Sequence, residues 1–250
     1  ENFYYQEYET LCKDRVSEEN FVSNKIPVSE YSPFVSSMFT SLHQVKTLRS
    51  CTALLGFLRG GGKTLPAEES FNPARETANY LPAFEVIGEG FFIDFGFEKI
   101  SSWVEQNQDL IKKIEIIKGN GKGDFTHATD DESRLHPGFL MIHTFAHTVM
   151  RQLSIECGYG LTEISERIYF SEKLQMAGLL IYTASSDSEG SLGGLVRMIK
   201  PEYFESLMIN AIENIRTCSN DPICFESNGQ GHSGLNLAAC HACSMVPDLA

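Results

Sequence analysis

The sequence lacks a long apolar run, and no stretch approaches the roughly 18 consecutive apolar residues that a membrane-spanning helix needs. It also lacks the apolar segment near residue 1 that is typical of an exported protein. Both absences predict a chain that contacts no membrane and works in the cytoplasm. Disulfides are rare in reducing compartments, and seven cysteines is an odd number, so the cysteines need another explanation.

Basic residues are scarce. The chain has 20 Lys and Arg against 33 Asp and Glu, which gives a formal net charge of -13, and it has no dense cluster of Lys and Arg. Nucleic-acid binding depends on neutralised phosphates and released counterions. We therefore expect weak DNA binding by this chain alone, with a basic partner supplying most of the affinity. No residue is assigned to nucleic-acid binding.

The pattern of apolar residues and breakers predicts helices and strands without strict alternation. The expected helices cover 98–106, 137–158 and 201–216, and the expected strands cover 45–57 and 177–183, with two more strands meeting at a glycine turn within 83–95. Such an order favours an α+β fold with mixed sheet and helices and a C-terminal four-cysteine zinc-binding segment.

Two regions are expected along the chain. Residues 1–135 form an upstream α+β region with flexible loops at Gly60–Gly62 and around 119–124, and residues 136–250 form a zinc-binding domain. The chain begins at Glu1 instead of Met and stops soon after its last cysteine. We therefore expect it to be a fragment of a larger protein.

The last part of the chain is rich in cysteine. Cys218 and Cys224 are five residues apart, fifteen residues follow, and Cys240 and Cys243 form a Cys-x2-Cys pair. Zn²⁺ takes four sulfur or nitrogen ligands in a tetrahedron, so two thiolate pairs predict a structural zinc site at Cys218, Cys224, Cys240 and Cys243. The first pair is wider than usual, which leaves His241 or His232 open as a substitute ligand. Cys12, Cys51 and Cys157 are scattered among apolar residues and are interpreted as buried core thiols.

Two glycine-rich segments fail as catalytic motifs. Gly60–Thr64 ends like a phosphate-binding loop, but Phe57 stands where that motif needs glycine. Gly190–Gly193 is similar to a nucleophile elbow, but position 189 is Glu instead of Gly. We therefore predict no catalytic residue in this segment.

A pair of histidines, His143 and His147, lies four residues apart on one face of an expected helix. A zinc-protease helix would need Glu at position 144 to activate water, and Thr stands there. Because the helix is apolar, buried hydrogen bonding is the favoured interpretation. A metal-dependent hydrolase that uses both histidines and nearby carboxylates stays open as an alternative, although Glu163 and Glu166 have no expected chemical role.

Several segments resemble a domain found at the ends of Mrf-type superfamily-two helicases and in bacterial antiphage proteins. These segments are His143–His147, 158–159, 166–169, 178–182, 190–195, Cys218–Cys224 and 239–243. The upstream segments 44–49, 54–57 and 81–92 resemble the DrmB family of DISARM defence systems. The resemblance implies a four-cysteine zinc site at Cys218, Cys224, Cys240 and Cys243.

The same resemblance implies a function. The chain would be a non-catalytic, zinc-binding accessory subunit of a DISARM-like antiphage complex that engages foreign DNA. A helicase-like, DrmA-like ATPase would be its partner, and DNA would be contacted through the complex. The alternative is the C-terminal domain of an Mrf-type ATP-dependent DNA repair helicase.

Overall fold

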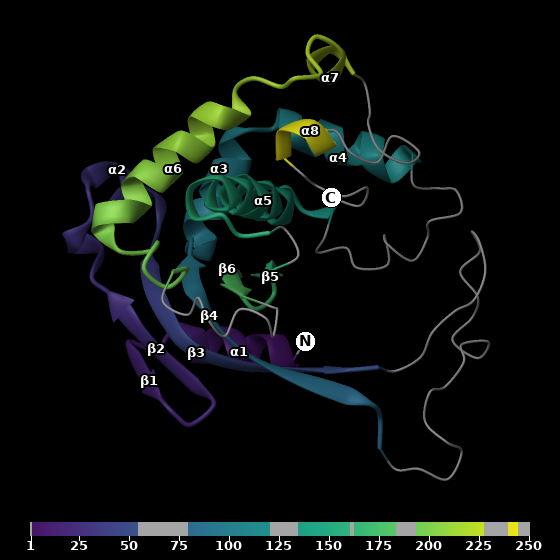
Figure 1. Ribbon diagram of the computed structural model, residues 1–250. Helices are drawn as coiled ribbons and strands as arrows, with labels where there is room; N and C mark the ends of the chain where they lie inside the picture. Colours follow the sequence, from purple (N-terminus) through teal and green to yellow (C-terminus); the bar gives the residue numbers. More distant parts are fainter. Residues whose placement is uncertain are drawn as a thin grey trace.

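The computed structural model describes residues 2–54, 80–120, 135–160, 163–183, 194–227 and 240–244. Its centre is a six-stranded sheet in the order β1-β2-β3-β4-β6-β5, and each neighbouring pair is antiparallel (Figure 1). The strands are β1 (Arg15–Ser17), β2 (Phe21–Ile26), β3 (Ser41–Ala53), β4 (Ala83–Asp94), β5 (Ile164–Ser171) and β6 (Met176–Thr183). Together with the helices this sheet confirms the predicted α+β class.

Helices cover both faces of the sheet. They are α1 (Asn2–Leu11), η1 (Val28–Glu30), α2 (Pro33–Met38), α3 (Phe97–Gln106), α4 (Asp109–Asn120), α5 (Pro137–Cys157), α6 (Pro201–Ile215), α7 (Ile223–Glu226) and α8 (His241–Ser244). Figure 1 shows α5 and α6 on one side of the sheet and α1 on the other. No described helix is long and apolar enough to cross a membrane.

The neighbouring strands β4 and β6 direct side chains to both faces of the sheet, because successive side chains of a strand point to opposite sides. Phe91 and Ile93 of β4 join the larger core cluster with α2, α3, α5 and α6. Phe92, which lies between them, joins Leu180 of β6 in a smaller cluster with Leu11 of α1. Burial on both sides explains the apolar runs 91–93 of β4 and 179–181 of β6.

The segment 83–95 differs from its prediction. It forms one strand, β4, instead of two strands meeting at a glycine turn. A Cβ on Gly90 would lie 2.0 Å from the carbonyl oxygen of Ile181, and one on Gly88 would lie 2.3 Å from that of Thr183. These glycines therefore allow β6 to approach closely and do not reverse the chain.

Helix α5 forms as its sequence predicts. Pro137 occupies the first turn, and His136 accepts a hydrogen bond from the Gly138 amide through Nδ1 at 3.0 Å. The helix ends at Gly158, whose φ of 76° is left-handed. The helices expected at 98–106 and 201–216 are confirmed as α3 and α6, and the strands expected at 45–57 and 177–183 as β3 and β6 over the described residues.

Strands from both sides of residue 135 share one sheet, since β4 pairs with β6 over five registered residues. The larger core cluster also takes residues from both sides, among them Phe91 and Leu179. The division into 1–135 and 136–250 stays a prediction. The glycine segment Gly60–Gly62 and the segment 190–193 lie outside the described residues, as does His232.

Candidate metal centre

Two short segments carry the four cysteines of the predicted zinc site. Cys218 follows α6 and opens a turn in which the Asp221 amide donates to the Cys218 carbonyl at 3.0 Å, while Asp221 Oδ2 accepts from the Cys218 amide at 3.0 Å. Cys224 lies in α7, and its amide donates to the carbonyl of Asn220 at 3.1 Å. The turn brings both ends of the wide Cys-x5-Cys pair to one point, which explains how five intervening residues still suit a single site.

The second pair comes from a helical turn. Cys240 precedes α8 and Cys243 lies within it, with the Cys243 amide donating to the Cys240 carbonyl at 3.2 Å. Both residues are buried, at 7% and 6% exposure. Cys218 and Cys224 are half-buried and pack against them.

The four sulfur atoms lie within 4.8 Å of one another. The Sγ atoms of Cys218 and Cys240 are 3.4 Å apart, those of Cys240 and Cys243 are 3.7 Å apart, and those of Cys224 and Cys243 are 3.9 Å apart. A tetrahedral ion with Zn–S bonds of about 2.3 Å would place its sulfurs roughly 3.8 Å apart. A disulfide needs about 2.05 Å, and none of these four cysteines forms a disulfide. The donor set and its spacing therefore fit Zn²⁺.

Hydrogen-bond donors around Cys240 favour a thiolate at this cysteine. The Asn220 amide donates to Cys218 Sγ at 3.4 Å, and Asn220 Nδ2 donates to Cys240 Sγ at 3.6 Å. Burial raises the pKa of the Cys240 thiol, but hydrogen bonds from Cys218 and from the Cys243 backbone outweigh burial and lower this pKa to about 6. Hydrogen bonds to the Cys240 sulfur thus prepare one negatively charged ligand, whereas burial raises the pKa of the Cys243 thiol to about 12 in the absence of an ion.

Helix α5 packs against the segment that carries Cys243. Arg151 donates through Nη1 to the Cys243 carbonyl, and α5 contacts α8. Figure 1 shows α8 beside α5. A long helix that is buried against the sheet thereby holds the short helix that carries Cys243.

A second group of metal-ligating side chains lies on α5 and β5. His143 Nε2 and His147 Nε2 are 3.0 Å apart, and Glu166 Oε1 lies 3.7 Å from the first and 3.4 Å from the second. The predicted hydrogen bonding of the histidines is present. The sequence assigned no chemical role to Glu166, but the structure places its carboxylate beside both histidines. The signal that could have found it is the position of Glu166 on the strand that follows the histidine helix.

The remaining cysteines differ from their prediction as core thiols. Cys51 and Cys157 are exposed, and only Cys12 is half-buried, against the smaller core cluster. Cys51 lies on the part of β3 that extends past its pairing with β2, and Cys157 is the last residue of α5. Apolar neighbours in the sequence thus did not imply burial at these two positions.

Residues 145–244 match the family model of the MrfA Zn-binding domain. This chain is therefore a protein with an MrfA-type zinc-binding domain, and all four clustered cysteines fall inside the matched range.

The chain is a homologue of the DISARM protein DrmB. It is 37% identical to "DISARM protein DrmB" of Bacillus paralicheniformis over 224 residues, which cover 84% of this chain. Those residues make up 38% of the relative, so the chain spans well under half of that protein. The similarity extends upstream of the zinc-binding domain, as the resemblance of the segments before residue 136 predicted.

Proposed function

We propose that this chain is the zinc-stabilised part of a non-catalytic accessory subunit in a DISARM-like antiphage complex. The observation that carries the proposal is the convergence of four cysteine sulfurs within 4.8 Å inside a segment that matches a zinc-binding domain. Cys218, Cys224, Cys240 and Cys243 would hold one Zn²⁺ with no open position. A closed four-sulfur site is structural, since catalytic zinc keeps a position for water or substrate.

Zinc at this site would join the turn that carries Cys218 and Cys224 to the segment that carries Cys240 and Cys243. Helices α7 and α8 are four residues each, too short to be stable alone. Structural zinc contributes roughly 10–16 kcal/mol of apparent binding free energy in small peptides, which is enough to fold such segments. The ion would therefore fix the surface that these segments present to a partner.

The proposed partner is a helicase-like, DrmA-like ATPase of the same defence system. Homology to a DISARM protein supports partnership with other DISARM subunits. The net charge of -13 supports a division of labour in which the partner contacts the DNA phosphates. We also propose a cytoplasmic location, because thiolate ligands need a reducing compartment.

An Mrf-type helicase is the second candidate, and the match to the MrfA Zn-binding domain favours it. That match covers only 145–244, whereas the similarity to DrmB covers 84% of the chain. The DrmB-like assignment therefore accounts for more of the sequence.

Co-purification tests the accessory role. The full chain would be co-expressed with the helicase-like subunit of the same system, as wild type, as Cys240→Ser and as Cys51→Ser. Cys51 is exposed and lies outside the cluster, so its variant controls for loss of a thiol. We expect wild type and Cys51→Ser to retain the partner and Cys240→Ser to lose it. Absence of a stable complex with wild type would contradict the proposal.

A further inference from the structure

Three donor atoms converge beside α5, apart from the cysteines. They are His143 Nε2, His147 Nε2 and Glu166 Oε1, separated by 3.0, 3.4 and 3.7 Å. Ligands around one ion with bonds of about 2.0–2.2 Å lie roughly 3.0–3.7 Å apart for angles between 90° and 120°. The three separations fall within that range.

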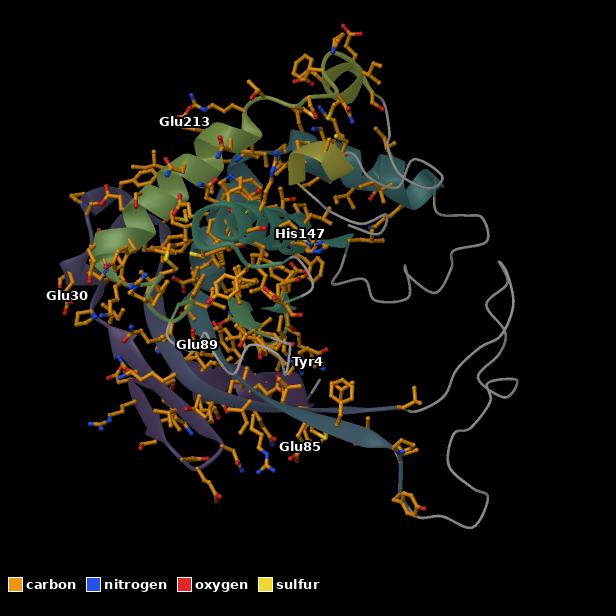
Figure 2. The ribbon with its side chains drawn as sticks, viewed as in Figure 1. Tyr4, Glu30, Glu85, Glu89, His147 and Glu213 are labelled. Carbon is orange, nitrogen blue, oxygen red and sulfur yellow. The ribbon has the colours of Figure 1, made fainter. Side chains whose placement is uncertain are left out.

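The three side chains come from regular secondary structure. His143 and His147 are four residues apart on α5, so they lie on one helix face one above the other. Glu166 comes from β5, which pairs with β6 along its whole length and contacts α5. Figure 2 shows His147 on α5, near the β5–β6 edge of the sheet. The site would thus join a helix to the strand that it covers.

Hydrogen bonds among the three side chains do not account for all three contacts. A neutral imidazole has one N–H, so when one Nε2 donates to the other at 3.0 Å, the accepting Nε2 has no proton left for Glu166 Oε1. When the proton of each ring is on Nδ1, both Nε2 atoms instead offer lone pairs, and these face the same point as the oxygen Oε1 of Glu166. Two such nitrogens and a carboxylate oxygen are the ligands of a cation.

No cationic side chain takes this role among the residues that the structure describes, where the ion pairs of Glu166 are with the two histidines. The adjacent Arg167 lies on the opposite face of β5, where it pairs with Glu7 at 2.8 Å and lies over the ring of Tyr4. The side chains of His143, His147 and Glu166 keep 16%, 10% and 25% of their surface exposed. An ion could therefore enter from solvent.

We propose that His143, His147 and Glu166 form a second metal site, which binds a divalent first-row transition-metal ion. Two imidazoles and one carboxylate suit Fe²⁺, Co²⁺, Mn²⁺ and Zn²⁺. Three protein ligands leave coordination positions for water, so this ion exchanges more readily than zinc held by four thiolates. The site is distinct from the cysteine cluster in its residues and in its donor atoms.

The test uses the full chain with zinc already bound, titrated with Co²⁺ and followed by calorimetry. We expect about one further equivalent in wild type. His143→Gln and Glu166→Gln each remove one ligand, and we expect their affinity for Co²⁺ to fall at least tenfold. His136→Gln is the matched control. This substitution also removes an imidazole that lies beside a carboxylate, but the pair of His136 and Glu172 is outside the cluster. Equal binding by wild type and both ligand variants would overturn the site.

X-ray absorption at the cobalt edge of the wild-type protein gives a second readout that needs no variant. We expect nitrogen and oxygen neighbours without sulfur. A sulfur shell would show cobalt at the cysteines and contradict the proposal, as would the absence of a further equivalent. Both results are compatible with a metal site at the four cysteines, so failure of the second site does not contradict the first.

Discussion

At the level of single residues, several polar side chains are buried within the sheet. His43 of β3 is fully buried, with Nε2 2.8 Å from Ser41 Oγ and the ring beside Phe92. Burial, with a smaller contribution from Lys25, lowers the pKa of His43 from 6.5 to about 4, although Asp14 acts in the opposite direction. This imidazole is therefore neutral in the folded protein at neutral pH.

His43 predicts a loss of stability in mild acid. The unfolded chain binds a proton near pH 6.5 and the folded chain only near pH 4, so folding opposes protonation between these values. Stability should fall as the pH falls through this window, by up to about 3 kcal/mol at pH 4. Urea unfolding of wild type and His43→Gln between pH 7 and pH 4.5 measures this, and we expect a flatter pH dependence for the variant. Identical slopes would show that His43 does not carry the effect.

At the level of elements, β4 and α5 organise the molecule. Glu89 of β4 is buried, and its Oε1 accepts hydrogen bonds from the amides of Leu195 and Val196 at 2.9 and 3.4 Å. Figure 2 shows Glu89 on the sheet side of α5. The Tyr31 hydroxyl donates to the Ile199 carbonyl at 2.5 Å, so the segment 194–200 is held at both ends.

Glu89 is expected to stabilise the docking of this segment. Glu89→Ala leaves the buried Leu195 amide and the half-buried Val196 amide without this acceptor and should cost about 1–3 kcal/mol in the free energy of unfolding. Glu89→Gln retains a side-chain oxygen and should cost less. Chemical unfolding of the two variants measures the difference. Equal stability of Glu89→Ala and wild type would show that the carboxylate is dispensable.

Arg151 should couple α5 to the zinc site. Its guanidinium donates to the Cys243 carbonyl, and a charged hydrogen bond contributes about 1.5–3 kcal/mol. We expect Arg151→Ala to release zinc to a chelator about tenfold faster than wild type, whereas Arg151→Lys keeps a donor and should lie between them. Stopped-flow transfer of zinc to a coloured chelator measures these rates. Unchanged release from Arg151→Ala would place the support of α8 elsewhere.

The same elements show what a sequence can predict. Pro137 and Gly158 mark the ends of α5 through local backbone chemistry, and the spacing of the cysteines indicates their shared ligand chemistry. The prediction of a turn at the β4 glycines was wrong, because glycine is suited both to a turn and to close approach of another strand. Only the position of β6 distinguishes the two roles. Glu166 was missed because its contact with His147 is tertiary and leaves no periodic signal in either segment.

At the level of the whole molecule, one sheet joins the DrmB-like upstream region to the zinc-binding domain. Neither part buries its apolar surface without the other, since β4 pairs with β6 and both feed the same two clusters. We therefore expect the cysteine segments to be a local addition to a body that folds around α5. Loss of zinc should release α7 and α8 and leave the sheet folded.

The zinc content of the purified chain tests the central claim most directly. Native mass spectrometry and X-ray absorption at the zinc edge would compare wild type with Cys240→Ser, with Cys51→Ser as control. We expect about one zinc per chain with four sulfur neighbours in wild type and Cys51→Ser, and a loss of that zinc in Cys240→Ser. A folded wild-type chain without zinc, or full zinc content in Cys240→Ser, would contradict the assignment of the four-cysteine site.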